Sequence, residues 1–158
     1  MIHICPSPTA DMRTCDYAAV TKKQLRESSI QHIRDVRDGF YFLIERLQVA
    51  AECHDYDKLT ELAWFRRDFI TGFKKTGWWD NHRQVNRHHL AQADGAREDV
   101  NLIDVLEYIV DCVMAGMARS GTVTPVDIDP DVLLKAFQNT VELLKSQVVV
   151  DKLQGETP

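Results

Sequence analysis

Apolar residues recur at three- and four-residue steps along most of this chain, and this spacing constrains its fold more than any other feature. Side chains spaced in this way lie on one face of an α-helix. The pattern predicts helices over about 21–54, 60–73, 101–119 and 131–149. The only β-branched run, 147–150, is expected to continue the last helix. The sequence therefore predicts an all-α fold, a compact single-domain bundle of five to six helices.

The segments outside this periodic pattern are short. Residues 1–20 lack periodicity and are expected to form an irregular N-terminal arm, followed by a single all-α domain over 21–150 and a frayed tail over 151–158. A polar loop is expected at 92–98. A chain of 158 residues is long enough for one such domain with its own hydrophobic core.

The composition excludes several classes of function. The chain has 24 acidic against 19 basic residues and a net charge of −5, which argues against general nucleic-acid binding. It contains no apolar run of the roughly 20 residues that a membrane span needs, and it begins without a signal-peptide pattern. The 4 cysteines form no Cys-x-x-Cys pair. We therefore expect a cytoplasmic protein, without membrane partners, whose thiols are free and mostly buried.

The helix expected at 101–119 carries an acidic stripe. At about 100° per residue, Asp104, Glu107 and Asp111 share one narrow face, and apolar residues cover most of the rest. We expect such a helix to be largely enclosed, so its carboxylates need cations. No Lys or Arg lies three or four residues from them. The partner is either a metal ion or a set of arginines from elsewhere, with candidates Arg66, Arg67 and Arg83.

Two further segments carry side chains that can bind a metal ion. His54 and Asp55 are adjacent at the end of an apolar helical segment, where both can ligate one divalent ion; the alternative is a capping or surface pair. The second segment, 78–90, is expected to be helical in its second half. On a helix, His82 and His89 would share a face about 10 Å apart, and would serve two ions or one ion and an orienting role.

Arginines and tryptophans in the same segment suit a phosphorylated ligand. Arg83 and Arg87 are four residues apart, on a face next to that of the histidines, and would bind a phosphate group. Trp78 or Trp79 could stack on a base if that ligand is a nucleotide. The alternative is a solvent-facing polar helix with its tryptophans anchored in the core.

The order of these residues resembles the HD-domain superfamily of metal-dependent phosphohydrolases, whose members are all-α. That pattern consists of a helix-borne His, a His-Asp pair, extra histidines and a late Asp. The chain is also similar to a small uncharacterised bacterial and phage family with four short motifs. They read here as His32-Ile33-Arg34-Asp35-Val36, His54-Asp55-Tyr56-Asp57-Lys58, Asn86-Arg87-His88-His89 and Glu107-Tyr108-Ile109-Val110-Asp111.

The resemblance implies a set of site residues. The implied ligands of a divalent ion (Mn, Fe, Co, Ni, Zn or Mg) are His32, His54, Asp55, His82, His89 and Asp111, with His88 as the alternative to His89. The implied catalytic residues are Asp55, Lys58 and Glu107, and the implied substrate contacts are Lys58, Arg83, Arg87 and Trp79. One condition applies to His32. On an unbroken helix it would lie about 33 Å from His54, so it can be a ligand only if the helix breaks at Asp38-Gly39.

The function that these patterns favour is hydrolysis of a small phosphorylated substrate, a nucleotide for preference, by a metal-activated water. The alternative, from a different class, is a non-catalytic helical protein of phage origin that binds metal structurally or works by binding another protein. The sequence leaves open whether the chain forms a homo-oligomer.

Overall fold

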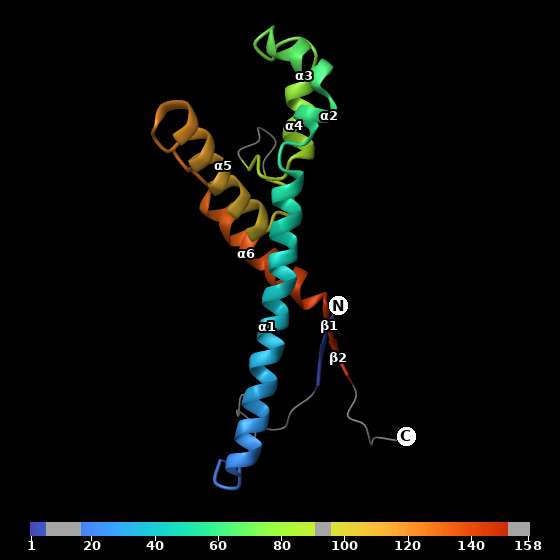
Figure 1. Ribbon diagram of the computed structural model, residues 1–158, viewed down its shortest axis with the longest axis vertical. Coiled ribbons are helices and arrows are strands. Elements are labelled where there is room, and N and C mark those ends of the chain that lie inside the picture. Colours follow the sequence, from blue (N-terminus) through green and yellow to red (C-terminus); the bar gives the residue numbers. More distant parts are fainter. Residues whose placement is uncertain (6–16, 91–95, 152–158) are drawn as a thin grey trace. The chain divides into compact units, whose positions relative to one another are not determined.

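The computed structural model describes residues 1–5, 17–90 and 96–151. These are mostly helical, which confirms the helical fold class in its broad form (Figure 1). The elements in chain order are β1 (Ile2–Ile4), α1 (Lys22–Cys53), α2 (Asp57–Thr60), α3 (Leu62–Phe69), α4 (Trp78–Val85), α5 (Leu102–Ser120), α6 (Pro130–Lys145) and β2 (Val148–Val150). They gather into two compact units, one of Met1–Ile44 with Glu142–Pro158 and one of Glu45–Val141. Among the described residues, no helix is both long and apolar enough to cross a membrane.

The first unit contains a small sheet that the sequence pattern did not reveal. β1 and β2 pair in parallel, with Ile2 opposite Val148 and Ile4 opposite Val150. His3 of β1 also contacts Asp151, with 3.0 Å between Nδ1 and Oδ1. The predictions that 1–20 is wholly irregular and that 147–150 continues the last helix are therefore wrong. Consecutive valines favour extended backbone, but the partner strand lies at the other end of the sequence, beyond the reach of a local pattern.

α1 is one continuous helix of 32 residues. Thr21 and Gln24 form a reciprocal cap at its start. The backbone N–H of Gln24 donates to the Thr21 hydroxyl at 3.2 Å, and the backbone N–H of Thr21 donates to Oε1 of Gln24 at 3.0 Å. The helix runs through Gly39 without a break, and a Cβ at that position would touch Leu144 at 3.9 Å. The condition under which His32 could join His54 is not met, so the prediction of His32 as a ligand is wrong.

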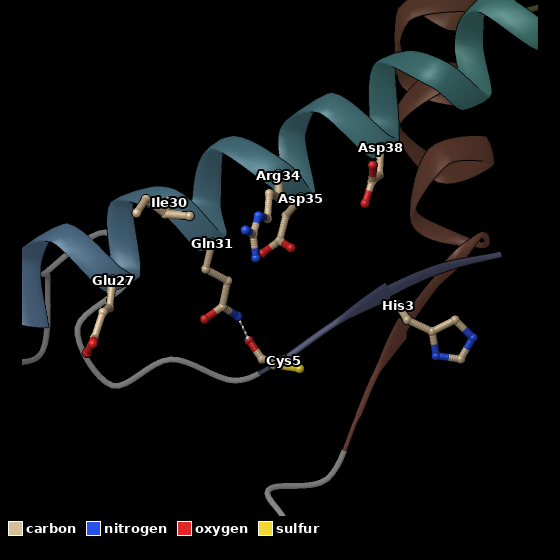
Figure 2. Close-up of a pocket in the computed structure, with 8 residues that line it drawn as sticks. All are labelled: His3, Cys5, Glu27, Ile30, Gln31, Arg34, Asp35 and Asp38. Atoms are coloured by element: carbon tan, nitrogen blue, oxygen red, sulfur yellow. Dashed lines mark hydrogen bonds between the residues drawn. The ribbon is translucent and has the colours of Figure 1, made fainter.

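The N-terminal half of α1 turns a polar face towards β1. A shallow hollow here is lined by His3 and Cys5 on one side and by α1 side chains such as Gln31 and Asp35 on the other. Figure 2 shows the Gln31 side chain reaching across to donate a hydrogen bond to the Cys5 carbonyl. This contact ties the residue after β1 to the helix.

The second unit has its hydrophobic core between α5, α6 and the segment that precedes α5. The buried members of this core are Leu90, Val100, Val105 and Ala136. α5 begins with a capping box, in which Asn101 accepts from the Ile103 amide and Asp104 accepts from the Asn101 amide, both at 2.9 Å. Its last residue precedes Gly121, whose φ of 71° ends the helix. The helix predicted at 101–119 is confirmed.

The prediction that this helix is largely enclosed is wrong. Val105 and Cys112 lie on one buried face of α5, and Val105 belongs to the core, but the opposite face lies open beyond the first turn. Its exposed side chains include Val110 at 59% and Met114 at 64%. Of the three cysteines among the described residues, Cys112 is buried, whereas Cys5 and Cys53 are exposed, contrary to the expectation of mostly buried thiols.

A tight corner between α3 and α4 positions the histidine-rich segment. The buried carboxylate of Asp68 accepts hydrogen bonds from the backbone amides of Thr76, at 2.8 Å, and Trp79, at 3.0 Å. Gly77, with a φ of 71°, precedes α4. α4 therefore occupies the first half of 78–90, not the predicted second half. The helix predicted over 60–73 corresponds to the shorter α3, which is preceded by the separate turn of α2. The last predicted helix ends at Lys145 rather than 149, and most of the loop predicted at 92–98 lies outside the described residues.

Candidate metal centre

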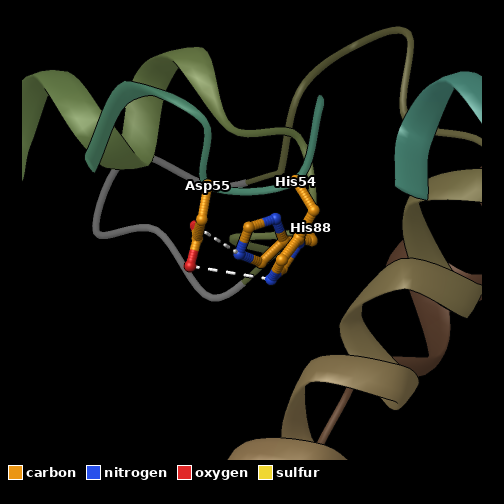
Figure 3. A group of neighbouring side chains, drawn as sticks. All are labelled: His54, Asp55 and His88. Atoms are coloured by element: carbon orange, nitrogen blue, oxygen red, sulfur yellow. Dashed lines mark ion pairs between the residues drawn. The ribbon is translucent and has the colours of Figure 1, made fainter. Parts of the chain in front are cut away.

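The backbone turns sharply at the end of α1 and thereby places two adjacent side chains together. α1 ends at Cys53, and Asp55 has a φ of 54°, in the left-handed region that non-glycine residues adopt rarely. The Lys58 amide donates to the Asp55 carbonyl at 3.0 Å and closes the turn into α2. Both His54 and Asp55 face the centre of the site, as the sequence pattern predicted for a helix end (Figure 3).

His54 and His88 are held by the same carboxylate of α5. Their Nδ1 atoms lie 2.8 and 3.0 Å from Oε1 of Glu107. An ionised carboxylate only accepts hydrogen bonds, so both imidazoles carry their proton on Nδ1 and present a lone pair at Nε2. Burial would raise the pKa of Glu107, but the hydrogen bonds from His88 and His54 outweigh it and hold that pKa below its usual range. In Figure 3 both imidazoles face the carboxylate of Asp55.

His82 of α4 is oriented in the same way by a different carboxylate. Its Nδ1 lies 2.8 Å from Oδ2 of Asp57, and the Asn86 amide donates to Oδ1 of Asp57 at 3.1 Å. His82 is fully buried, and its Nε2 has no hydrogen-bond partner. A buried lone pair without a donor costs free energy unless a cation meets it.

His88 and His89 reach the site because α4 ends before them. Asn86 has extended backbone, with a ψ of 115°, so the chain leaves the helix and folds back. The ring centroid of His89 lies 4.9 Å from that of His82 and 4.3 Å from that of His88. The separation of about 10 Å that a continuous helix implied between His82 and His89 is therefore wrong. Nε2 of His89 also lacks a hydrogen-bond partner.

His89 stays neutral near physiological pH. Burial is the main cause, and it lowers the pKa of His89 from 6.5 to about 4. A neutral imidazole keeps a lone pair free for a metal ion. The sequence left open whether His88 or His89 is the ligand. In the structure both rings lie in the cluster.

Asp55 is the residue that these histidines share. Its carboxylate oxygens lie 3.3 Å from Nε2 of His82 and 3.6 Å from Nε2 of both His54 and His88. Two ligands of a tetrahedral ion with bonds of about 2.1 Å are about 3.4 Å apart. Oδ1 of Asp55 is buried and has no hydrogen-bond donor. Two sets of ligand atoms, each within 4.8 Å of one another, therefore meet at this carboxylate: His54, Asp55 and His88, and Asp55, His82 and His89.

The remaining predicted residues differ in how close they come. The Lys58 ammonium contacts Oδ2 of Asp55. Asp111 lies at the edge, 3.8 Å from Nε2 of His54, with its side chain 34% exposed. The ring of Trp79 packs 5.3 Å from that of His82.

The two arginines predicted to bind phosphate are paired with carboxylates. Arg87 donates to both oxygens of Asp104 at 2.7 and 2.8 Å and to Asp99 at 2.8 Å. Arg83 pairs with Asp80 at 2.6 Å. These pairs leave Lys58 as the predicted phosphate contact that lies within the cluster itself.

Asp57 and Asn86 were not predicted as site residues from the sequence, although both lie in the motifs quoted above. The signal that could have identified them is the requirement that a ligating histidine donate its second N–H to an acceptor. No family model, curated protein or solved structure matches this chain.

Proposed function

We propose that this protein is a metal-dependent phosphohydrolase of the HD-domain type, acting on a small phosphorylated substrate. One observation carries the proposal: four imidazoles surround the partly buried Asp55. Its Oδ1 and the Nε2 atoms of His82 and His89 are buried and have no hydrogen-bond partner. Histidines whose Nδ1 atoms are fixed by carboxylates are typical of metal ligands. The mixture of imidazole and carboxylate suits Mn, Fe, Co, Ni or Zn better than Mg.

The chain's own groups divide the work of such a site. A bound divalent ion supplies Lewis-acid chemistry, lowering the pKa of a coordinated water and offsetting negative charge on phosphoryl oxygens. Glu107 and Asp57 keep the imidazoles in one tautomer and orientation. Asp111, at the exposed edge, accepts a proton from the attacking water or completes the ligand set. Lys58 binds the phosphate group, and Trp79 stacks on a base if the substrate is a nucleotide.

The first test measures metal and activity together. Elemental analysis of the purified protein is expected to find a divalent transition metal, and dialysis against a chelator is expected to remove both the metal and phosphate release from a panel of nucleotides and sugar phosphates. His54→Ala is expected to lose both. His32→Ala is the matched control, because His32 is an exposed histidine of α1, the helix that His54 follows. Full metal content in His54→Ala, or equal loss in both variants, contradicts the proposal.

A second candidate function is a non-catalytic metal-binding module that works by binding another protein. The exposed apolar side chains of α5, such as Val110 and Met114, favour it. It predicts a closed coordination shell and no turnover with any phosphorylated compound. Exchange of water at the bound metal, measured by proton relaxation of the Mn²⁺-loaded protein, distinguishes the two candidates.

A further inference from the structure

The two carboxylate oxygens of Asp55 have different surroundings. Oδ1 faces Nε2 of His82 and has no hydrogen-bond donor. Oδ2 receives the Lys58 ammonium and lies 3.6 Å from Nε2 of His54. Lys58 therefore places a positive charge among the atoms that are arranged to hold a metal ion.

An ion that takes Oδ2 of Asp55 and Nε2 of His54 as ligands would share that carboxylate oxygen with the Lys58 ammonium. Two positive charges at one carboxylate oxygen also repel each other strongly in a half-buried site. The Lys58 side chain is 33% exposed, and its long flexible stem lets the ammonium move towards solvent while the backbone stays in α2. The ion and the ammonium are thus alternative occupants of Oδ2.

We propose that Lys58 is a tethered cation that neutralises Asp55 in the metal-free protein, is displaced by the divalent ion, and then binds the anionic group of the substrate. This rests on the proposed function for the existence of the ion site. It adds an order of events, because the phosphate contact becomes available only when the ion has bound. Linkage makes the effect reciprocal, so a phosphate anion also tightens ion binding.

The other cations near the site explain why this role falls to Lys58. Arg87 is held by Asp104 and Asp99, and Arg83 by Asp80. Ion binding at Asp55 leaves these pairs with other aspartates intact. It does release Lys58, whose carboxylate partner is the ligand itself.

Calorimetric titration tests the coupling, with Mn²⁺ and inorganic phosphate as probes. The metal-free wild type is expected to bind phosphate at least about tenfold more weakly than the Mn²⁺-loaded protein. Lys58→Met is expected to bind Mn²⁺ about tenfold more tightly than the wild type, because the competing charge is gone, and to lose the coupling to phosphate. Lys74→Met, at an exposed lysine between α3 and α4, is the matched control and is expected to change neither affinity.

A second measurement needs no variant. The rate at which an acetylating reagent modifies Lys58 in the wild type, followed by mass spectrometry, is expected to rise when Mn²⁺ is bound and to remain unchanged at Lys74. Weaker Mn²⁺ binding in Lys58→Met, or equal phosphate binding with and without Mn²⁺, overturns the inference, because Lys58 is then a permanent partner of Asp55. Wild type that binds no ion overturns the inference and the proposed function together. Coupled binding without turnover overturns only the hydrolase.

Discussion

Two neighbouring clusters of charge in the second unit differ in how they are neutralised. In the first, Arg87 forms a two-pronged contact with Asp104 at 2.7 and 2.8 Å and reaches Asp99 as well. In the second, Asp55 lies among imidazoles, three of which are hydrogen-bonded through Nδ1 to Glu107 or Asp57. Its Oδ1 has no hydrogen-bond donor. The chain passes from one cluster to the other between Arg87 and His88. The ion pair of Arg87 therefore holds the segment that carries His88 and His89 into the site.

This difference separates charge that maintains the fold from charge that binds a ligand. Asp104 is almost fully buried and matched by hydrogen-bond donors, including the backbone amide at the start of α5. Burying the carboxylate of Asp55 would raise its pKa, yet the hydrogen bond and the charge of Lys58 hold that pKa below its usual range. Asp55 thus stays ionised beside lone pairs that repel it, and a divalent cation satisfies both.

The largest effect on stability is expected in the cluster of Arg87, Asp104 and Asp99, where the charges are paired. Asp104→Asn removes the buried carboxylate partner of Arg87 and leaves the exposed Asp99 as its remaining ion pair, and we expect a loss of about 3–5 kcal/mol in the free energy of unfolding. Urea denaturation followed by circular dichroism measures it. The folded fraction should still bind metal. A variant as stable as the wild type would remove the distinction between the clusters.

Asp55→Asn is expected to show the opposite pattern. It removes the ligand that both sets of histidines share, so metal affinity should fall more than about 100-fold, beyond the range typical of groups that only orient ligands. Stability without metal should fall less than in Asp104→Asn, because the Lys58 ammonium that loses its partner is partly exposed and can move to solvent. Calorimetric metal titration and urea denaturation measure the two effects. Asp80→Asn, at an exposed aspartate, serves as the comparison, and a similar loss of metal there would discount the result.

Asp57→Asn tests whether the orientation of His82 by a carboxylate contributes to metal binding. It keeps the shape of the side chain but removes the charge that fixes His82, and metal affinity is expected to fall about 10- to 100-fold. Competition with a fluorescent chelator provides the measurement. Unchanged affinity would mean that His82 does not ligate the ion.

The smallest effect is expected at the exposed partner of Arg87. The side chain of Asp99 is 69% exposed, so Asp99→Asn should cost less than about 1 kcal/mol, and high salt should reduce the difference. Urea denaturation at low and high ionic strength measures it. A cost as large as that of Asp104→Asn would show that burial does not determine the strength of these contacts.

The helices were predictable to the extent that local pattern determines them. Three- and four-residue spacing identified α1 and α5, and Gly121 marked the end of α5. Asp38-Gly39 was a possible break in the sequence pattern, but α1 runs through it without interruption. The sheet of β1 and β2 joins the two ends of the sequence. No local pattern carries such a long-range pairing.

The site was predictable in its residue types but not in its geometry. His54, Asp55 and the histidines of 82–89 were identified, and the structure brings them together. Treating 82–89 as a helix separated His82 from His89, because the end of α4 at Val85 depends on the extended backbone of Asn86. The choice of partner for Arg87 depends on where Asp104 lies in space, which spacing along the sequence does not reveal.

The most direct test of the central claim, that the groups around Asp55 hold a divalent ion, is the metal stoichiometry of the protein. Metal-free wild type, His82→Ala and His32→Ala are each dialysed against Mn²⁺ or Zn²⁺ with a weak competing chelator and analysed by plasma mass spectrometry. We predict that wild type and His32→Ala retain at least one ion per chain, and that His82→Ala retains less than either. Wild type that retains no ion, or His82→Ala that retains as much as the wild type, would contradict the account.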